Sequence, residues 1–139
     1  MTYLLDSTVL VDVGRRHGPT LAWLPRQRAS TLHLPTITVG ELVRGIHHRH
    51  GHDALYRARH LGQLAREIDQ MFPGRLLPFD RVAAEIWGRL MGEGAARGRT
   101  PPSDDAKIAA IALRHGLTVA TSNTRDFAPL VATVDPRTA

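Results

Sequence analysis

The chain has 139 residues, enough for one domain with a real core and too few for two ordinary domains. Cysteine is absent, which excludes disulfides and thiolate metal sites and suits a reducing compartment. No apolar run approaches the roughly 20 residues that span a bilayer, and the N-terminus lacks the pattern of a signal peptide. We therefore expect one domain over residues 1–139, a cytoplasmic location and no membrane contact.

The charge of the chain is strongly basic, with a formal net charge of +5 and a pI near 10.9. Many of its arginines lie between residues 44 and 66, mixed with five histidines. Such a composition favours a polyanionic partner. A GC-rich genome also produces Arg- and Ala-rich chains, so charge alone leaves nucleic-acid binding open.

The first third of the chain alternates short apolar segments with amphipathic ones. A buried strand is predicted over residues 2–6 and a helix over 7–16. A second strand at 32–37 leads into a helix at 38–46, whose apolar residues are spaced i, i+3, i+4 and i+7. This order is typical of units in which helices connect parallel strands.

The same alternation continues to the end of the chain. A long amphipathic helix over 53–72 is expected to stop at Pro73 and Gly74. The elements predicted after it are a strand at 75–79, a helix at 80–98, a helix at 104–116, and strands at 117–121 and 131–134. The final "DPRTA" is expected to fray. The pattern predicts an α/β fold with a central parallel sheet of about five strands flanked by helices.

Acidic residues follow several of the predicted strands. Asp6 ends the first strand, Glu41 lies after the second, and Asp126 follows the fourth. Asp104 and Asp105 begin the helix that leads into the fourth strand. Ligands of parallel α/β sheets bind beyond the carboxyl ends of the strands, so these acids are candidates for one site.

Each acid also has a purely structural explanation. Asp6 can cap the helix after it, and Glu41 can complete a capping box with Thr38 as N-cap. Asp104 and Asp105 directly follow Ser103, which is a natural N-cap, and negative charge there is favoured by the positive end of the helix dipole. Asp126 can be a turn residue. Taken singly, each acid is better explained by structure than by catalysis.

The argument for a site is that the acids gather at one edge of the sheet. Two carboxylates about 4 Å apart repel by about 4 kcal/mol at an effective dielectric of 20. Several of them therefore stay ionised together only with a cation, and oxygen ligands suit Mg²⁺ or Mn²⁺. An acidic metal pocket in a basic protein predicts hydrolysis of phosphodiester bonds.

Four segments carry a resemblance to a known family: "LLDSTVLVD", "ITVGELVRGI", "LPFDRVAAEIWGRL" and "PSDDAKIAAIALRHGLTVATSNTRDF". In order and spacing the chain resembles the PIN-domain ribonucleases, and among them the VapC toxins of VapBC toxin-antitoxin modules and the similar FitB proteins. The resemblance implies a three-layer α/β/α fold. It also implies that Asp6 and Glu41 bind metal, and it selects Asp105 over Asp104, because the family's acid stands three residues before the isoleucine of "IAA".

The sequence departs from the family's pattern in one turn. Asn123 stands where the family often has aspartate, and Asp126 is the acid expected to compensate. Thr8 occupies a position where relatives often have Asn or Ser. It is expected either to orient a metal-bound water or to cap the helix.

The resemblance implies a metal-dependent endoribonuclease in which Asp6, Glu41 and Asp105 hold one Mg²⁺ or Mn²⁺. The site is expected to take one ion or two, a second one lying near Asn123 and Asp126, and the products are expected to carry 5′-phosphate and 3′-hydroxyl ends. The substrate class is RNA, whether tRNA, rRNA or mRNA. The implied partners are a VapB-type antitoxin, operator DNA bound through that antitoxin, and a second copy of the chain in a homodimer.

Two other classes of function stay open. One is a catalytically inactive PIN-like module that binds nucleic acid or protein; such a relative is expected to have lost one of the acids. The other is a phosphatase of the haloacid dehalogenase type, which needs a second aspartate where this chain has Thr8. The histidines between 47 and 60 lack a strict ligand pattern and are interpreted as a solvated or RNA-facing surface.

Overall fold

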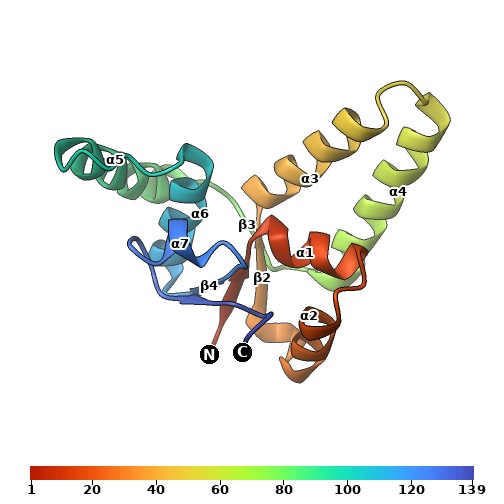
Figure 1. Cartoon of the computed structure of the whole chain (residues 1–139), viewed down its shortest axis with the longest axis horizontal. Helices are drawn as coiled ribbons and strands as arrows, with labels where there is room; N and C mark the ends of the chain where they lie inside the picture. Colours follow the sequence, from red (N-terminus) through yellow and green to blue (C-terminus); the bar gives the residue numbers. More distant parts are fainter.

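A five-stranded parallel sheet forms the centre of the molecule in the computed structural model, which describes residues 1–139 (Figure 1). The strand order is β3-β2-β1-β4-β5, and every neighbouring pair is parallel. The strands are β1 (Tyr3–Leu5), β2 (Leu32–Pro35), β3 (Leu76–Leu77), β4 (Thr118–Ala120) and β5 (Thr133–Val134). The predicted α/β fold with a parallel sheet is therefore confirmed.

Helices connect the strands and cover both faces of the sheet. The longer ones are α1 (Ser7–Gly14), α3 (Thr36–Arg49), α4 (Ala54–Met71), α5 (Arg81–Ala96) and α6 (Ser103–His115). The shorter ones are α2 (Gly18–Trp23), α7 (Thr124–Phe127) and two single turns of 3₁₀-helix, η1 (Leu24–Arg26) and η2 (Ala29–Thr31). No helix combines the length and the apolar character that crossing a membrane requires.

Two hydrophobic cores lie on opposite faces of the sheet, because successive side chains of a strand point in opposite directions. Leu4 of β1 packs with α5 and α6, mainly against the alanine and isoleucine side chains of α6. Leu5 belongs to the other core, which contains Val9 of α1, Trp23 of α2 and Ile68 of α4. The result is the predicted three-layer α/β/α arrangement.

The starts of two helices differ from the sequence prediction. α3 begins at Thr36 after Pro35, two residues earlier than expected, so Thr38 is no N-cap and the predicted capping box with Glu41 does not form. The Thr38 hydroxyl is buried and donates to the Leu5 carbonyl at 3.1 Å, which ties α3 to the end of β1. α6 begins at Ser103 with Pro102 in the N-cap position, so Ser103 does not cap it either.

The C-terminal tail, expected to fray, is held against the body of the protein. Arg137 donates to both carboxylate oxygens of Asp12 in α1, at 2.8 and 2.6 Å. The hydroxyl of Thr20 in α2 donates to the same carboxylate at 2.9 Å. Asp12 has a side chain only 4% exposed, and its pKa is lowered, chiefly by the hydrogen bonds from Arg137. The tail, α1 and α2 therefore share one buried polar contact.

The α3–α4 hairpin projects away from the sheet (Figure 1). Its tip is held by ring contacts rather than by a core: His50 stacks on His60 with the centroids 4.7 Å apart, and Tyr56 meets both rings edge-on. Leu55, predicted to lie on the packed face of α4, is 73% exposed there. The histidines form no group of three metal-binding side chains.

Candidate functional site

The acidic residues of the predicted site lie beyond the carboxyl ends of β1 and β4, which are neighbours in the sheet. The chain runs outward from β1 through β2 to β3 and then returns to the other side of β1 as β4. The strand order therefore reverses between β1 and β4, which is where α/β sheets bind ligands. Register brings the two strand ends together: Leu5 pairs with Ala120, and the Asp6 amide donates to the Ala120 carbonyl at 3.0 Å.

Asp6 stands in the N-cap position of α1, yet its side chain does not cap the helix. Its Oδ2 instead accepts hydrogen bonds from the hydroxyls of Thr121, at 2.8 Å, and Thr8, at 3.2 Å. The residue is only 3% exposed. The simple capping explanation of Asp6 is therefore wrong: this buried carboxylate is held by two hydroxyls and points across the strand ends.

Besides holding Asp6, the hydroxyls of Thr8 and Thr121 also hold the backbone of the connection that follows β4. Thr8 Oγ1 accepts a hydrogen bond from the Ser122 amide at 3.1 Å and lies 3.3 Å from Thr121 Oγ1. Thr121 Oγ1 accepts from the Asn123 amide at 2.9 Å. Thr121 was missed in the sequence reasoning, although a polar residue directly after a buried strand was the signal that could have found it. Thr8 contacts the site and does not cap α1.

Asn123 brings two more acids together. Its Nδ2 donates to Asp126 Oδ2 at 2.9 Å and to Asp105 Oδ2 at 3.4 Å. Asp104, the neighbour that the prediction set aside, lies near Lys107 instead, with 3.8 Å between Oδ1 and Nζ. The amide of Asn123 therefore bridges the carboxylates of Asp105 and Asp126, as a donor and without the charge that an aspartate would add.

Glu41 reaches the same place from the second turn of α3. Its Oε1 is buried and has no hydrogen-bond partner. The pKa of Glu41 is raised to about 7, first by burial of the carboxyl group and then by the negative charges of Asp6, Asp104 and Asp105. The pKa of Asp105 is raised to about 6, again first by burial and then by the charges of Asp6, Asp126 and Asp104. These acids feel one another's charge across the sheet edge.

The donor chemistry of this cluster fits a divalent cation. It contains only oxygen ligands, and the orphaned Glu41 Oε1 together with two raised carboxyl pKa values marks an excess of buried negative charge. In this conformation no three of the side chains are close enough to form a ligand set. Asp6, Glu41 and Asp105 would therefore have to come closer together before they could share an ion.

Glu41→Gln is expected to make the metal-free protein more stable at pH 8. A carboxyl whose pKa is raised in the folded state stabilises the fold below its unfolded pKa, and that stabilisation is lost as pH rises through about 7. At pH 8 the ionised Glu41 opposes folding by about 1 kcal/mol, a value discounted for its partial exposure. We expect a melting temperature in EDTA that is higher for Glu41→Gln than for the wild type at pH 8, and equal at pH 4.

The same experiment with Mg²⁺ has the opposite expected outcome. Binding of an ion to the folded state raises the melting temperature of the wild type, and Glu41→Gln should lose most of that rise. Gln63→Glu, on the surface of α4, changes a charge outside the cluster and serves as the control. A Mg²⁺-dependent rise that is equal in wild type and Glu41→Gln would remove Glu41 from the ligand set.

Comparison with known proteins agrees with the geometry. The sequence model of the PIN domain matches residues 3–130. The chain is 37% identical to the plasmid stability protein StbB of Pseudomonas syringae pv. tomato and 33% identical to the VapC ribonuclease Y4jK of Sinorhizobium fredii, each over 89% of both chains.

Solved structures show the same similarity over the whole fold. The crystal structure of FitAcB from Neisseria gonorrhoeae contains a chain with a TM-score of 0.87 and 31% identity, covering 97% of this chain and 98% of that one. In the structure of FitAB bound to a DNA fragment, the matching chain has a TM-score of 0.85 and 28% identity, covering 98% and 96%. With its parallel sheet, its acids at the β1–β4 edge and these relatives, the chain belongs to the PIN-domain family.

Proposed function

We propose that this protein is the toxin of a VapBC-type toxin-antitoxin module and that it acts as a metal-dependent endoribonuclease. Its activity would be carried by a single PIN domain over residues 1–139. The observation that carries the proposal is the cluster of Asp6, Glu41 and Asp105 at the point where the strand order reverses, in a chain that covers most of a VapC ribonuclease. Its net charge of +5 suits an RNA substrate.

Asp6, Glu41 and Asp105 would hold Mg²⁺ or Mn²⁺, and Asp126 with Asn123 would complete the site or take part in a second one. A bound divalent ion lowers the pKa of water and neutralises charge that develops at the phosphate. The hydroxyls of Thr121 and Thr8 keep Asp6 turned toward the site. The Asn123 side chain donates to both Asp105 and Asp126, which keeps these two carboxylates near each other.

The proposed partners follow from the relatives. The FitAcB and DNA-bound FitAB structures support a VapB-type antitoxin that inhibits the enzyme and carries the complex to operator DNA. We also propose a homodimer and a cytoplasmic location, where RNA substrates and antitoxin are both found. The acids do not determine which RNA is cut or at which position. Recognition of unstacked loop bases depends on the protein surface around the acids.

The two competing functions are less well supported. A phosphatase of the haloacid dehalogenase type needs an aspartate in place of Thr8, whose hydroxyl here donates to Asp6. An inactive PIN-like module would gain nothing from keeping Asp6, Glu41 and Asp105 within reach of one another, since gathered carboxylates destabilise a fold that binds no cation.

The test is incubation of the antitoxin-free protein with total cellular RNA in Mg²⁺, Mn²⁺ or EDTA, followed by mapping of the fragment ends. We expect cleavage that requires the metal and leaves 5′-phosphate and 3′-hydroxyl ends, as hydrolysis by water does. Ends with a 2′,3′-cyclic phosphate would contradict the proposal, because the ribose hydroxyl would then be the nucleophile. Absence of cleavage of every RNA in either metal would favour the inactive module.

A further inference from the structure

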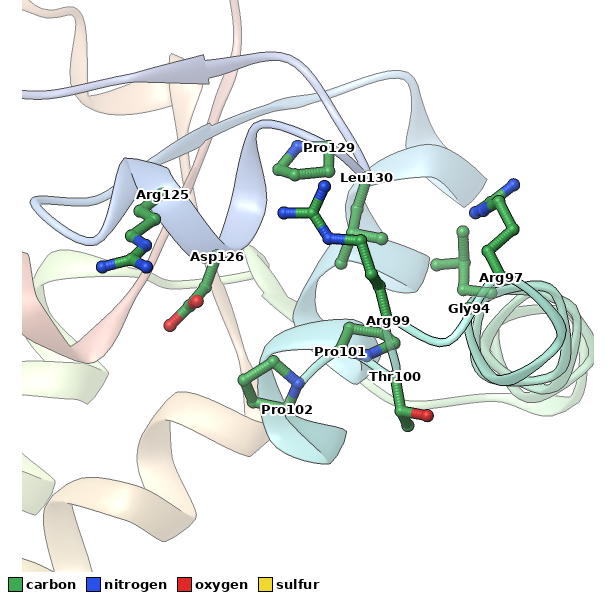
Figure 2. A pocket seen from close by; sticks show the side chains of 11 residues that line it. Gly94, Arg97, Arg99, Thr100, Pro101, Pro102, Arg125, Asp126, Pro129 and Leu130 are labelled. Carbon is green, nitrogen blue, oxygen red and sulfur yellow. The ribbon is translucent and has the colours of Figure 1, made fainter.

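A hollow of about 520 Å³ lies directly beside the acid cluster (Figure 2). It is open to solvent on one side and is lined by the C-terminal part of α5, by residues 97–102, by α7 and by the segment that connects α7 to β5. Three arginines line it, Arg97, Arg99 and Arg125. Asp126, which hydrogen bonds to Asn123 in the acid cluster, also lines the hollow, so the two sites adjoin through this residue.

The three arginines are available for a ligand. All three are exposed, and none of them forms an ion pair or a side-chain hydrogen bond within the protein. The arginines within α5 differ from these three: Arg81 pairs with Glu85 and Arg89 pairs with Glu93, each one turn along the helix. The hollow therefore concentrates unpaired positive charge next to a site that is predicted to act on phosphate.

The backbone that carries Arg97 and Arg99 is fixed against α5. The amide of Arg99 donates to the Gly94 carbonyl at 2.8 Å, and the amide of Arg97 donates to the Glu93 carbonyl at 3.1 Å. Gly94 allows this close approach, because a Cβ there would lie 2.8 Å from the Arg99 carbonyl oxygen and 2.7 Å from Cδ of Pro101. The guanidinium groups therefore extend from an anchored turn, which lowers the entropy cost of binding a ligand.

We propose that this hollow binds backbone phosphates of single-stranded RNA on one side of the cleaved bond. The inference rests on the proposed function, since it extends the RNA path from the acid cluster past Asp126 and Arg125 to Arg97 and Arg99. Guanidinium groups match phosphate oxygens in geometry and charge. Positive charge at this position also counteracts the repulsion that the acid cluster exerts on an incoming polyanion.

The lining of the hollow favours nucleic acid over a protein segment. Only two of its eleven lining residues are hydrophobic. A second hollow, of about 470 Å³ between α1, α3 and α4, has seven hydrophobic residues among eleven and offers the apolar surface that a bound peptide buries. The hollow beside the acids has a smaller hydrophobic lining, of two leucines with three prolines, and it carries three unpaired arginines, which suits phosphate better than a peptide.

The test compares two double variants of the whole chain that change charge equally. Arg97→Gln with Arg99→Gln removes the arginines of the hollow, and Arg81→Gln with Arg89→Gln removes two exposed arginines from α5 outside it. Dissociation constants for a fluorescent single-stranded RNA are measured in EDTA, which prevents cleavage, at several salt concentrations. Melting curves show that both variants are folded. Poly-L-glutamate is titrated in parallel as a model of an acidic protein segment.

We expect the Arg97/Arg99 double variant to bind RNA roughly tenfold more weakly than the wild type. A plot of the logarithm of the RNA-binding constant against the logarithm of the salt concentration should be shallower by about 1.4 for this variant. That is the value for two lost phosphate contacts on a single strand. The Arg81/Arg89 variant should stay within about twofold of the wild type.

Equal RNA affinities for the two double variants would overturn the proposal, and continued cleavage by the wild type would then leave the nuclease function standing. If the wild type binds no RNA in EDTA, the proposal for the hollow falls, and the nuclease function is decided separately by the cleavage assay in Mg²⁺ or Mn²⁺. A variant that keeps its RNA affinity but loses affinity for poly-L-glutamate would assign the hollow to an acidic protein segment and overturn the RNA proposal.

Discussion

Asp6→Asn should slow RNA cleavage roughly a thousandfold and leave the fold intact. Asp6 is the most buried of the acids and is held by two hydroxyls, so an amide of the same shape keeps the packing and the bond from Thr121. What it loses is the negative charge that would bind a divalent ion, and several kcal/mol of charge stabilisation corresponds to about three powers of ten in rate. Single-turnover rates at saturating protein, in Mg²⁺, measure the effect.

Asp104→Asn is the matched control for Asp6→Asn. It removes the same charge at the second residue of α6, but Asp104 lies near Lys107 and is about half exposed. We expect its rate to stay within about threefold of the wild type, because Asp104 lies near Lys107 and is not one of the proposed metal ligands. An Asp6→Asn variant that cleaves at the wild-type rate would contradict the proposed site, and a large loss from Asp104→Asn would show that Asp105 was the wrong choice between the two.

The sequence was most informative where local pattern and fold agree. Alternating strands and helices predicted the parallel sheet, and Gly116, with φ of +67°, ends α6 as expected. Two short helices were missed. α2 has only six residues and begins with Gly18 and Pro19, and α7 has four, so neither shows a helical period. α3 starts early because the extended backbone of Pro35 ends β2 directly before Thr36.

The acids of the candidate site could be found from the sequence because they follow strands, and the carboxyl ends of parallel strands share an edge. Their supporting contacts could not. Thr121 reaches Asp6 across a sequence separation of 115 residues, through the register of β1 on β4. The arginine hollow likewise combines residues 97–102 with Arg125, and no periodic signal connects segments so far apart.

The contact between the C-terminal tail and α1 is another case of long-range structure without a local signal. Nothing in the sequence of the helix around Asp12 indicates a distant partner, and Arg137 lies in a segment whose composition suggests fraying. Their side chains meet across 125 residues of sequence. Because α1 begins next to Asp6, the tail supports the helix that follows the first acid of the candidate site.

Arg137→Ala should lower the melting temperature by roughly 5 °C at pH 7, since it leaves the buried Asp12 carboxylate without its partly exposed charge partner. The carboxylate of Asp12 would stay buried with only the Thr20 hydroxyl to satisfy it. Truncation of Arg26, which donates to the carbonyl of Ala139 at 3.0 Å from an exposed position, leaves no buried charge and should change the melting temperature by about 1 °C. Differential scanning calorimetry measures both.

The pH dependence of the Arg137→Ala defect identifies its cause. In the wild type the lowered pKa of Asp12 adds stability above the unfolded pKa of about 4, and that stability is lost as pH falls through the folded pKa. The variant has lost this stabilisation, so its defect should shrink as pH falls below about 4. Adding Asp12→Asn to Arg137→Ala should restore part of the melting temperature at pH 7, because the buried group is then neutral. A defect that is constant with pH and unchanged in the double variant would show that Arg137 acts through packing and not through its charge.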